Sequence, residues 1–500
     1  MNGVLAIDQG TTGTTCLVLG PAGHVLGRGY SEFTQIFPRP GWVEHDAAEI
    51  WATTVRVAKA AIAEARSAQD GLTVVAIGIT NQRETVVVWD RETGEPVHNA
   101  IVWQDRRTAS RCRELKAAGE ESWVTEHTGL VLDPYFSATK IEWLLDHVDG
   151  LRPRAERGEL AAGTIDSWLI WKLTGGRSHV TDPSNASRTL LFNIHELRWD
   201  ERLLELFSVP ALLLPQVRPS AGVFGMTDPG VLGMSIPVCG VAGDQQAALF
   251  GQGCVHAGQA KNTYGTGAFL LLNTGSERVL STRGLLTTVA CGPRGEPAWA
   301  LEGSIFIAGA AVQWLRDGLG IIGGASESAA MASNLSSNDG VYFVPAFVGL
   351  GAPHWNPDAR GTIVGLTRGT TRSHLVRAAL EAMAYGTGEV LDAMTTDSGV
   401  ATTELAVDGG ASRNDWLMQF QADIVGVPVR RPQMVETTAA GAAGLAGIAA
   451  GLWRNADDFL AARPEPDRFR PVMTSDNRSA LISGWRRAVE TALAWAERKG

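Results

Sequence analysis

The sequence has few cysteines and no pattern that would pair them. Five cysteines occur, an odd number, and none of them is in C-x-x-C spacing. A disulfide framework and a zinc ribbon are therefore excluded, and the thiols are expected to be small core residues in a reducing compartment. The cysteines are Cys16, Cys112, Cys239, Cys254 and Cys291.

The sequence also lacks long runs of large apolar residues. Its first residues, MNGVLAIDQG, do not show the basic start and apolar stretch of a signal peptide. Residues 439–453, AAGAAGLAGIAAGLW, consist mostly of alanine and glycine and are too short for an ordinary membrane span. We read them as a closely packed buried helix, and we expect a cytoplasmic protein without membrane insertion.

Basic residues are in the minority. The 43 Lys and Arg residues stand against 53 Asp and Glu residues, for a formal net charge of -10. This balance argues against nucleic acid as a partner, because such binding draws much of its affinity from Lys and Arg. Lysine occurs at only six positions, none of them in a Gly-rich loop. Neither a G-x-x-x-x-G-K-[ST] loop nor a G-x-G-x-x-G turn after the first strand is present, which disfavours P-loop and Rossmann proteins.

What the sequence does contain is a repeated α/β pattern. A chain of 500 residues predicts two domains, which we place at 1–250 and 251–500. Apolar runs predict strands over 4–8, 16–20, 25–30, 74–80 and 85–90. A helix is expected after Asp46, with Asp46 and Glu49 as a capping pair. The pattern restarts at 261–273 and continues into a helix from Ile307, so the sequence predicts a duplicated α/β architecture with a ligand cleft between its halves.

Residues 5–15, LAIDQGTTGTT, combine a strand, an acidic residue and a Gly/Thr turn. Backbone N–H groups and hydroxyls in such a turn suit phosphate oxygens, and the carboxylate of Asp8 suits a nearby divalent cation. The alternative is an ordinary turn, since Asp, Gly and Thr are common turn residues. Residues 404–426, ELAVDGGASRNDWLMQFQADIVG, again contain a predicted strand, a Gly turn and then a helical pattern. The first backbone N–H groups of a helix starting there would favour an anion.

Several segments resemble, in order, the FGGY family of carbohydrate kinases, and among its members those that phosphorylate glycerol. The resemblance covers nearly the whole chain and implies an α/β, actin-like ATPase fold, in which two ribonuclease-H-like domains close over ATP and the acceptor. The segments are AIDQGTT, NQRET (81–85), IVWQDRRT (101–108), DPYFSATKIEWLLDH (133–147), AGDQQAALFGQ (242–252), YGTGAF (264–269), IAGAAVQWLRD (307–317) and VDGGASRND (407–415).

The resemblance also implies roles for individual residues. Asp244, in the GDQ turn, is expected to be the catalytic base, and the alternative is an N-cap of the following helix. Asp8 and Asp244 are expected near Mg²⁺. The expected glycerol site comprises Arg83, Glu84, Trp103, Tyr135, Asp244, Gln245 and Phe269. The expected ATP contacts are Thr11, Thr12, Gly13, Thr15, Thr266, Gly309, Gln313, Gly410, Ala411 and Asn414.

The chain departs from the family at two places. Many relatives carry arginine where this chain has Thr15, so a charged phosphate contact is missing. Residues 226–237, MTDPGVLGMSIP, contain no Lys, Arg or His, so we expect neither fructose 1,6-bisphosphate nor histidine phosphorylation to regulate the protein through this stretch. The resemblance makes a homodimer or homotetramer plausible.

Two other functions stay open at this point. One is a kinase for another polyol or a ketopentose, which would turn over little glycerol. The other is a non-catalytic actin-like protein that binds ATP or assembles, for which the fold alone would suffice.

Overall fold

The computed structural model describes residues 1–497, and the chain divides into two compact units. The first unit comprises Met1–Val255, Thr287–Trp299 and Glu436–Pro464, and the second comprises the other described residues. This differs from the contiguous halves, 1–250 and 251–500, expected from the sequence. Two segments that follow Val255 in the sequence, Thr287–Trp299 and Glu436–Pro464, belong to the first unit. The second of them contains a helix that packs on the central sheet of that unit.

The first unit is built on a six-stranded sheet with the order β13-β14-β5-β1-β2-β3. Strand β1 pairs antiparallel with β2 and parallel with β5, and β5 pairs parallel with β14. The strands are β1 (Asn2–Gln9), β2 (Gly13–Leu19), β3 (Val25–Glu32), β5 (Thr73–Asn81), β13 (Ala221–Met226) and β14 (Pro237–Gly243). Because β1, β5 and β14 are parallel, their carboxyl ends meet at one edge of the sheet.

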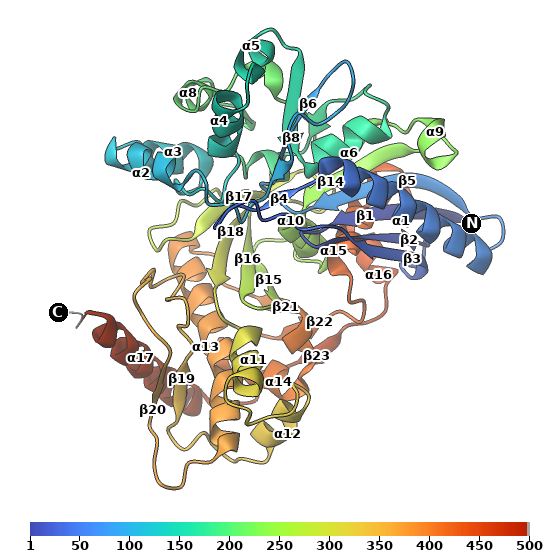
Figure 1. The fold of residues 1–500 in the computed structure, drawn as a ribbon. Helices are drawn as coiled ribbons and strands as arrows, with labels where there is room; N and C mark the ends of the chain where they lie inside the picture. Colours follow the sequence, from blue (N-terminus) through green and yellow to red (C-terminus); the bar gives the residue numbers. More distant parts are fainter. Residues whose placement is uncertain (498–500) are drawn as a thin grey trace. The chain divides into compact units, whose positions relative to one another are not determined.

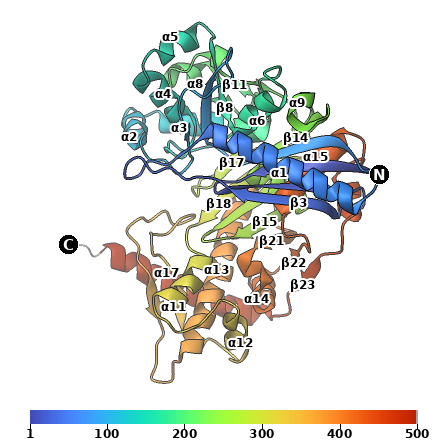
Figure 2. The same cartoon turned by 45° about the vertical axis from the view of Figure 1, so that its right-hand side comes forward.

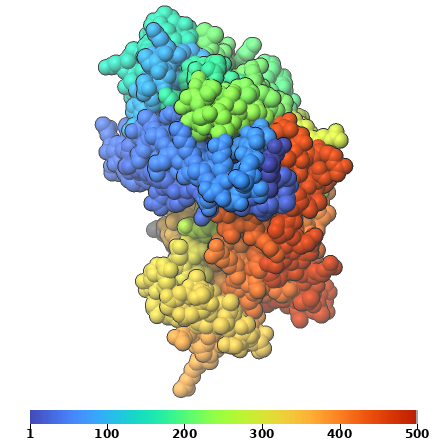
Figure 3. Space-filling view, turned by 90° about the vertical axis from the view of Figure 1, so that its right-hand side faces the viewer, coloured from blue at the N-terminus to red at the C-terminus, as the bar shows by residue number. Residues whose placement is uncertain are grey.

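Two helices cover this sheet closely. Helix α1 (Ala47–Ala68) packs on β3, where a Cβ at Gly27 would lie 2.3 Å from the carbonyl oxygen of Ala61. Helix α15 (Thr437–Ala449) packs on β5, where a Cβ at Gly78 would lie 2.1 Å from the carbonyl oxygen of Ala442. Figure 1 shows α15, coloured red-orange, beside the blue strands of the amino-terminal residues. In the space-filling view of Figure 3, orange-red atoms likewise lie against blue ones.

A smaller sheet in the first unit has the order β4-β7-β6-β8, and two-stranded pairs join β10 to β11 and β12 to β9. These strands are β4 (Glu44–His45), β6 (Val86–Asp90), β7 (Ala100–Ile101), β8 (Leu160–Thr164), β9 (Val180–Thr181), β10 (Phe192–Asn193), β11 (Arg198–Trp199) and β12 (Gln216–Val217). Strand β17 (Leu286–Cys291), most of which also belongs to the first unit, is not part of these sheets and pairs with β18. The other helices are α2 (Ala109–Ala117), α3 (Glu121–Thr128), α4 (Ala138–His147), α5 (Leu151–Glu156), α6 (Ile165–Leu173), α7 (Pro183–Ala186), α8 (Glu201–Leu206), η1 (Ala211–Leu213), α9 (Pro229–Leu232), α10 (Asp244–Gly251) and α16 (Ala456–Ala461).

The second unit repeats the central pattern of the first. Strand β15 pairs antiparallel with β16 and parallel with β21, as β1 does with β2 and β5. Figure 2 shows helices α11, α12, α13 and α14 grouped together in this unit. The duplicated α/β architecture expected from the sequence is therefore confirmed within each unit.

The strands of the second unit run in the order β18-β16-β15-β21-β22-β23, and β19 pairs with β20. They are β15 (Gln259–Tyr264), β16 (Ala268–Gly275), β18 (Pro297–Ile305, whose first residues belong to the first unit), β19 (Tyr342–Val344), β20 (Thr362–Val364), β21 (Glu404–Gly409), β22 (Val429–Arg431) and β23 (Asp467–Phe469). The helices are α11 (Gly309–Asp317), α12 (Glu327–Ser333), α13 (Arg372–Ser398), η2 (Gly410–Arg413), α14 (Asp415–Val425) and α17 (Ser475–Glu497).

The predicted elements near the amino terminus all form, with one correction. Asp46 caps α1 by accepting hydrogen bonds from the backbone N–H groups of Ala48 and Glu49. The Glu49 side chain does not complete the expected capping pair, because it instead accepts hydrogen bonds from the backbone N–H and hydroxyl of Thr34, each at 3.1 Å. It therefore holds the segment after β3 against the start of the helix.

Residues 439–453 behave as expected, since all but the last residues form the buried part of α15. Across residues 1–497, none of the helices combines the length and apolar character that crossing a membrane requires. All five cysteine side chains are buried, as the scattered spacing predicted.

The contact between α15 and α10 gives a stability prediction. A Cβ at Gly441 would lie 1.9 Å from the carbonyl oxygen of Ala247, so the two helix backbones would have to separate. We expect Gly441→Ala to lower the free energy of unfolding by about 1–3 kcal/mol, the usual cost of overpacking. Thermal and urea unfolding measure this change.

The matched control is Gly386→Ala in α13, where the nearest atom to the added Cβ, Cδ1 of Ile305, lies at an ordinary 3.5 Å. Alanine favours helix over glycine, so this variant should be neutral or slightly more stable. Equal effects of the two substitutions would contradict the close approach of α15 to α10.

Candidate active site

The Gly/Thr turn between β1 and β2 is a closed hairpin turn. The backbone N–H of Gly10 donates to the carbonyl of Gly13 at 2.9 Å. The hydroxyl of Thr11 accepts a hydrogen bond from the indole Nε1 of Trp103 at 2.9 Å. Thr12 is exposed at the tip of the turn, whereas Gly13 is buried. The turn expected to bind phosphate is thus hydrogen-bonded to Trp103, a residue expected to contact the acceptor.

Asp8 lies near the end of β1, directly opposite Thr15 in the hairpin register. Burial, the charge of Asp244 and the charge of Glu436 raise the pKa of Asp8 to about 7. Thr15 supplies no positive charge to oppose this shift, although side chains at opposed positions share one face of a hairpin. A nearby cation would therefore increase the ionised fraction of this carboxyl at neutral pH.

The donor set near Asp8 fits a hydrated magnesium ion. Mg²⁺ keeps several waters and is usually held by one or two carboxylates together with substrate phosphates. Asp8 and Asp244 are two carboxylates close enough to repel each other's charge. Within residues 1–497 no group of three or more His, Cys, Asp and Glu side chains could hold a metal, so a cage made only of protein ligands is absent there.

Arg83 lies between two carboxylates. Its Nε is 3.2 Å from Oδ1 of Asp244 and 3.7 Å from Oε1 of Glu84. Arg83 and Glu84 follow β5, and Asp244 follows β14, whose last residue Gly243 pairs with Asn81 of β5. The parallel pairing of these strands is what brings the NQRE and GDQ segments together.

Asp244 is the first residue of α10, and Gly243 occupies the N-cap position. Interpreting Asp244 as the N-cap is therefore wrong, although its Oδ1 does accept a hydrogen bond from the backbone N–H of Gln245 at 2.7 Å. The side chain of Asp244 is 32% exposed, whereas those of Arg83 and Glu84 are 2% and 1% exposed. The Asp244 carboxylate is thus accessible to a small molecule, whereas the adjacent Arg83 and Glu84 side chains are buried.

Tyr135 and Trp103 form the aromatic side of the same site. Their ring centroids are 5.4 Å apart with an interplanar angle of 73°. The buried Nζ of Lys140 donates to the carbonyls of Pro134 and Tyr135 at 2.5 and 2.8 Å, and so fixes the turn that carries Tyr135. Burial lowers the pKa of Lys140 to about 8.

Sequence reasoning missed three residues around this cluster. Lys140 and Arg188 are buried charges, with Nε of Arg188 donating to Oε1 of Glu84 at 2.7 Å. Gln246 accepts from Nη1 of Arg83 at 3.4 Å and donates to the hydroxyl of Thr288 at 2.9 Å. Arg188 and Gln246 gave no local signal, because their partners Glu84 and Arg83 lie 104 and 163 positions away along the chain.

The second unit contains a cavity of about 700 Å³. All six residues of this unit expected to contact ATP line it: Thr266, Gly309, Gln313, Gly410, Ala411 and Asn414. Its size is in the range of small-molecule sites. Phe269 lies on β16 of this unit and stays a prediction as a wall of the acceptor site.

Two turns shape one side of this cavity. The backbone N–H of Gly309, the first residue of α11, donates to the carbonyl of Gly265 at 3.0 Å. Asn414 caps α14 by accepting from the backbone N–H of Leu417, and its Nδ2 is 3.4 Å from the hydroxyl of Ser328. The N-termini of α11 and α14 lie at this cavity, where their dipoles favour an anionic ligand.

The apolar wall of the cavity was not predicted. Leu380 and Met383 line it from α13, and both are 2% exposed. In the sequence, the spacing of Leu380 and Met383 is typical of the buried face of any helix. The other residues that line the cavity come from distant parts of the chain, so the sequence does not show that these two residues face a cavity. Arg316 and Arg413 add positive charge to the lining.

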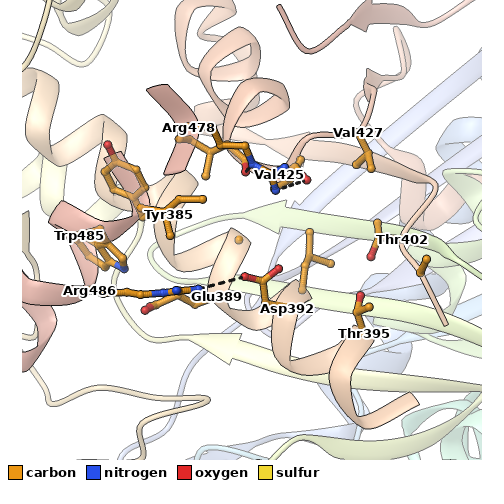
Figure 4. A pocket seen from close by; sticks show the side chains of 15 residues that line it. Tyr385, Glu389, Asp392, Thr395, Thr402, Val425, Val427, Arg478, Trp485 and Arg486 are labelled. Atoms are coloured by element: carbon orange, nitrogen blue, oxygen red, sulfur yellow. Dashed lines mark hydrogen bonds and ion pairs between the residues drawn. The ribbon is translucent and has the colours of Figure 1, made fainter. Parts of the chain in front are cut away.

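Another cavity in the second unit holds none of the predicted residues. It has a volume of about 220 Å³ and lies among α13, α14 and α17. Figure 4 shows Arg478 against Val425 and Arg486 beside Asp392. Arg478 donates to the carbonyls of Ile424 and Val425 at 2.6 and 3.0 Å, so its guanidinium is engaged in holding the end of α14.

The raised pKa of Asp8 gives a pH prediction. Because this pKa is raised from 3.8 to about 7, the folded protein retains between pH 4 and 7 a proton that the unfolded chain has released. Stability from this group is therefore lost as pH rises to 7. We expect Asp8→Asn to remove that loss, so that without metal or nucleotide the variant melts higher than the native protein at pH 8, with a difference that shrinks toward pH 5.

Thermal unfolding at pH 5, 6, 7 and 8 measures this difference, with Asp228→Asn as the control at an exposed helix cap. The prediction is wrong if native protein and Asp8→Asn keep the same difference in melting temperature at every pH. Added Mg²⁺ should stabilise the native protein at pH 8 and leave Asp8→Asn nearly unchanged.

Comparison with known proteins agrees with this geometry along the whole chain. The N-terminal domain of the FGGY family of carbohydrate kinases matches residues 3–251, and its C-terminal domain matches residues 260–450. The chain is 56% identical to glycerol kinase 2 of Thermotoga maritima, with 100% of both chains covered. It is 58% identical to glycerol kinase of Carboxydothermus hydrogenoformans, with 98% of each covered.

Solved structures give the same result. The crystal structure of Plasmodium falciparum glycerol kinase with ADP matches with a TM-score of 0.94 at 38% identity, covering 99% of this chain and 98% of that one. A xylulose kinase from Lactobacillus acidophilus, 20% identical and covering 100% and 99%, shares the fold with a TM-score of 0.88. The chain belongs to the FGGY family of carbohydrate kinases and has its two-domain, actin-like ATPase fold.

Proposed function

We propose that this protein transfers the γ-phosphoryl group of ATP to glycerol, giving sn-glycerol 3-phosphate and ADP, in glycerol catabolism. The observation that carries the proposal is the accessible carboxylate of Asp244, held 3.2 Å from the buried guanidinium of Arg83 beside Glu84. The named relatives, which match the whole chain at 56–58% identity, support glycerol as the acceptor.

Glycerol recognition rests on fixed polar groups beside an aromatic wall. Arg83 donates hydrogen bonds and the carboxylate of Glu84 accepts them, which suits adjacent hydroxyls of a small polyol. Trp103 and Tyr135 face the carbon backbone, and we extend the site to Gln245. Phe269, in the second unit, stays a prediction as a further apolar wall. An acceptor with a missing or misplaced hydroxyl would leave buried polar groups unpaired, which is the basis of discrimination in such sites.

Asp244 accepts the proton of the attacking hydroxyl. As the new O–P bond forms, the bond from the γ-phosphorus to the β,γ-bridging oxygen breaks, and the electron pair leaves with ADP. Arg83 orients the Asp244 carboxylate before the reaction. The base therefore acts from a fixed position and loses little entropy in the transition state.

We assign nucleotide contacts to each unit separately. Thr11, Thr12, Gly13 and Thr15 offer backbone and hydroxyl groups to the phosphates, and the lining residues of the 700 Å³ cavity hold the nucleoside. Mg²⁺, bound near Asp8 and Asp244, would neutralise phosphate charge. We further propose a cytoplasmic location and a homodimer or homotetramer.

ADP release from purified protein with Mg²⁺ and ATP tests the acceptor. We expect glycerol to stimulate release by at least about 10²-fold over no acceptor, in keeping with a positioned general base. Xylulose, ribulose and erythritol should stimulate it far less. A preference for one of these three would keep the kinase but reassign the acceptor, and no stimulation by any of them would favour a non-catalytic ATP-binding protein.

Asp244→Asn tests the base directly. We expect kcat to fall by about 10²–10⁴-fold, because proton removal is lost, while ATP binding stays within about threefold of the native protein. Steady-state kinetics and calorimetric titration of ATP measure the two effects, with Asp228→Asn as the control. Unchanged turnover in Asp244→Asn would rule out its role as base.

A further inference from the structure

Residues 182–188, DPSNASR, form a buried polar segment beneath the acceptor site. Asp182, Ser184, Asn185 and Arg188 are each 0% exposed, although each carries polar or charged groups. Burying such groups is costly unless they are hydrogen-bonded or paired. Helix α7, which spans most of the segment, has only four residues, so the reason for this burial lies in the segment's contacts with other elements.

The first contact reaches the turn that carries Asp244. The backbone N–H of Gly243, the residue before Asp244, donates to Oγ of Ser184 at 2.9 Å. Ser184 in turn donates to Oδ2 of Asp182 at 2.6 Å, and Ser220 donates to the same oxygen at 2.7 Å. The carboxylate of Asp182 therefore orients the Ser184 hydroxyl, and this hydroxyl holds the backbone N–H of Gly243, the residue before α10.

The backbone of Gly243 passes close to the side chain of Arg83. A Cβ at this position would lie 2.8 Å from the Arg83 side chain, so the backbone of the GDQ turn passes directly against Arg83. A small rotation of the Gly243 peptide would change both the direction of Asp244 and its 3.2 Å contact with Arg83. The hydrogen bond from Gly243 to Ser184 opposes this rotation.

The second contact reaches the end of β5. The side-chain amide of Asn81 donates to Oδ1 of Asn185 at 3.0 Å. The amide of Asn185 donates to Oδ1 of Asp182 at 2.9 Å, so the same carboxylate that orients Ser184 also orients Asn185. Asn81 precedes Arg83 by two residues, and the segment thereby holds both strand ends that supply the acceptor site.

The third contact is with acceptor residues themselves. Nε of Arg188 donates to Oε1 of Glu84 at 2.7 Å, and the guanidinium carbon lies 5.9 Å from the ring centroid of Tyr135. Glu84 has φ of +62°, a backbone conformation that residues other than glycine rarely adopt. Its carbonyl accepts from Oγ of Ser137 at 2.9 Å. Arg188 therefore fixes the carboxylate of a residue whose backbone is held in a strained conformation.

We propose that the 182–188 segment is the positioning element of the acceptor site, in which Arg188 sets the carboxylate of Glu84 for glycerol binding and Ser184 sets the turn that aims Asp244. The inference rests on the proposed function. It divides the two roles: Arg188 acts on acceptor affinity, and Ser184 acts on the transfer step. Neither residue needs to touch the substrates.

Arg188→Lys tests the first role in the full-length protein. Lysine keeps the charge but not the planar donor geometry. We expect the KM for glycerol to rise about tenfold or more, as for loss of a hydrogen bond to a charged group, while the KM for ATP stays within about twofold. Melting-temperature shifts with glycerol alone should need correspondingly more glycerol.

Arg91→Lys is the matched control in the same unit. Arg91 donates to the carbonyls of Leu160 and Leu212, both at 2.9 Å, and contacts none of the acceptor residues through these bonds. It should lose stability without changing either KM. If Arg188→Lys behaves like Arg91→Lys, the positioning role of Arg188 is refuted.

Ser184→Ala tests the second role by removing a single oxygen atom. This change is small, so the variant should fold even if Arg188→Lys fails to fold. We expect kcat to fall about fivefold or more, because the Gly243 N–H loses its partner, while the KM for glycerol stays within about twofold. Ser187→Ala is the control, since Ser187 donates to the carbonyl of Ser184 and not to Gly243. Equal kcat in Ser184→Ala and native protein would overturn the role of Ser184.

The outcomes separate this inference from the proposed function. If the native protein shows no glycerol-dependent ADP release, the proposed function fails first. If it does, and Arg188→Lys and Ser184→Ala show the expected split between KM and kcat, the inference is supported. If both variants lose a similar fraction of kcat and keep both KM values unchanged, the segment is merely structural and the inference is refuted.

Discussion

The acceptor site depends on offsetting the negative charge of carboxylates gathered at one edge of a sheet. Asp8 lies near the end of β1, Glu84 follows β5 and Asp244 follows β14, and the parallel pairing of these strands brings the three carboxylates to one edge of the sheet. Arg83 and Arg188 offset part of this charge through ion pairs with Asp244 and Glu84. Asp8 faces the uncharged Thr15 across the hairpin, and burial together with the charges of Asp244 and Glu436 raises its pKa to about 7. The site is thereby prepared for a cation.

The same hairpin geometry serves two different tasks in the two units. In the first unit the turn after β1 carries Thr11 and is bonded to Trp103, next to the charged cluster. In the second unit the turn after β15 carries Thr266 and opens onto a large, partly apolar cavity. In both cases a short Gly/Thr turn follows a buried strand, and the two turns differ in the groups that lie beside them.

Much of the architecture could be predicted because it is encoded locally. Alternating apolar runs and glycine turns indicated the hairpins, and all six residues assigned to the nucleotide in the second half line one cavity. The capping role of Asp46 was likewise visible, but the partner of Glu49 was not, since Thr34 competes for it from another element. Interpreting Asp244 as an N-cap was wrong because Gly243 takes that position. The compact units differ from the contiguous halves, although the two family domains match residues 3–251 and 260–450, because α15 packs on β5 and β14 of the first unit.

The sequence by itself determined the strand and turn pattern, the family, and the identity of the groups that meet at the sheet edge, since these follow from short-range periodicity and from motifs. Only the tertiary structure decided which buried charges support them. Lys140 holds the Tyr135 turn and Arg188 holds Glu84 across 104 positions of the sequence. Such pairings depend on which strand ends and loops are packed together. They are selected because a buried charge left without a partner would be strongly destabilising, and not by any local preference of the chain.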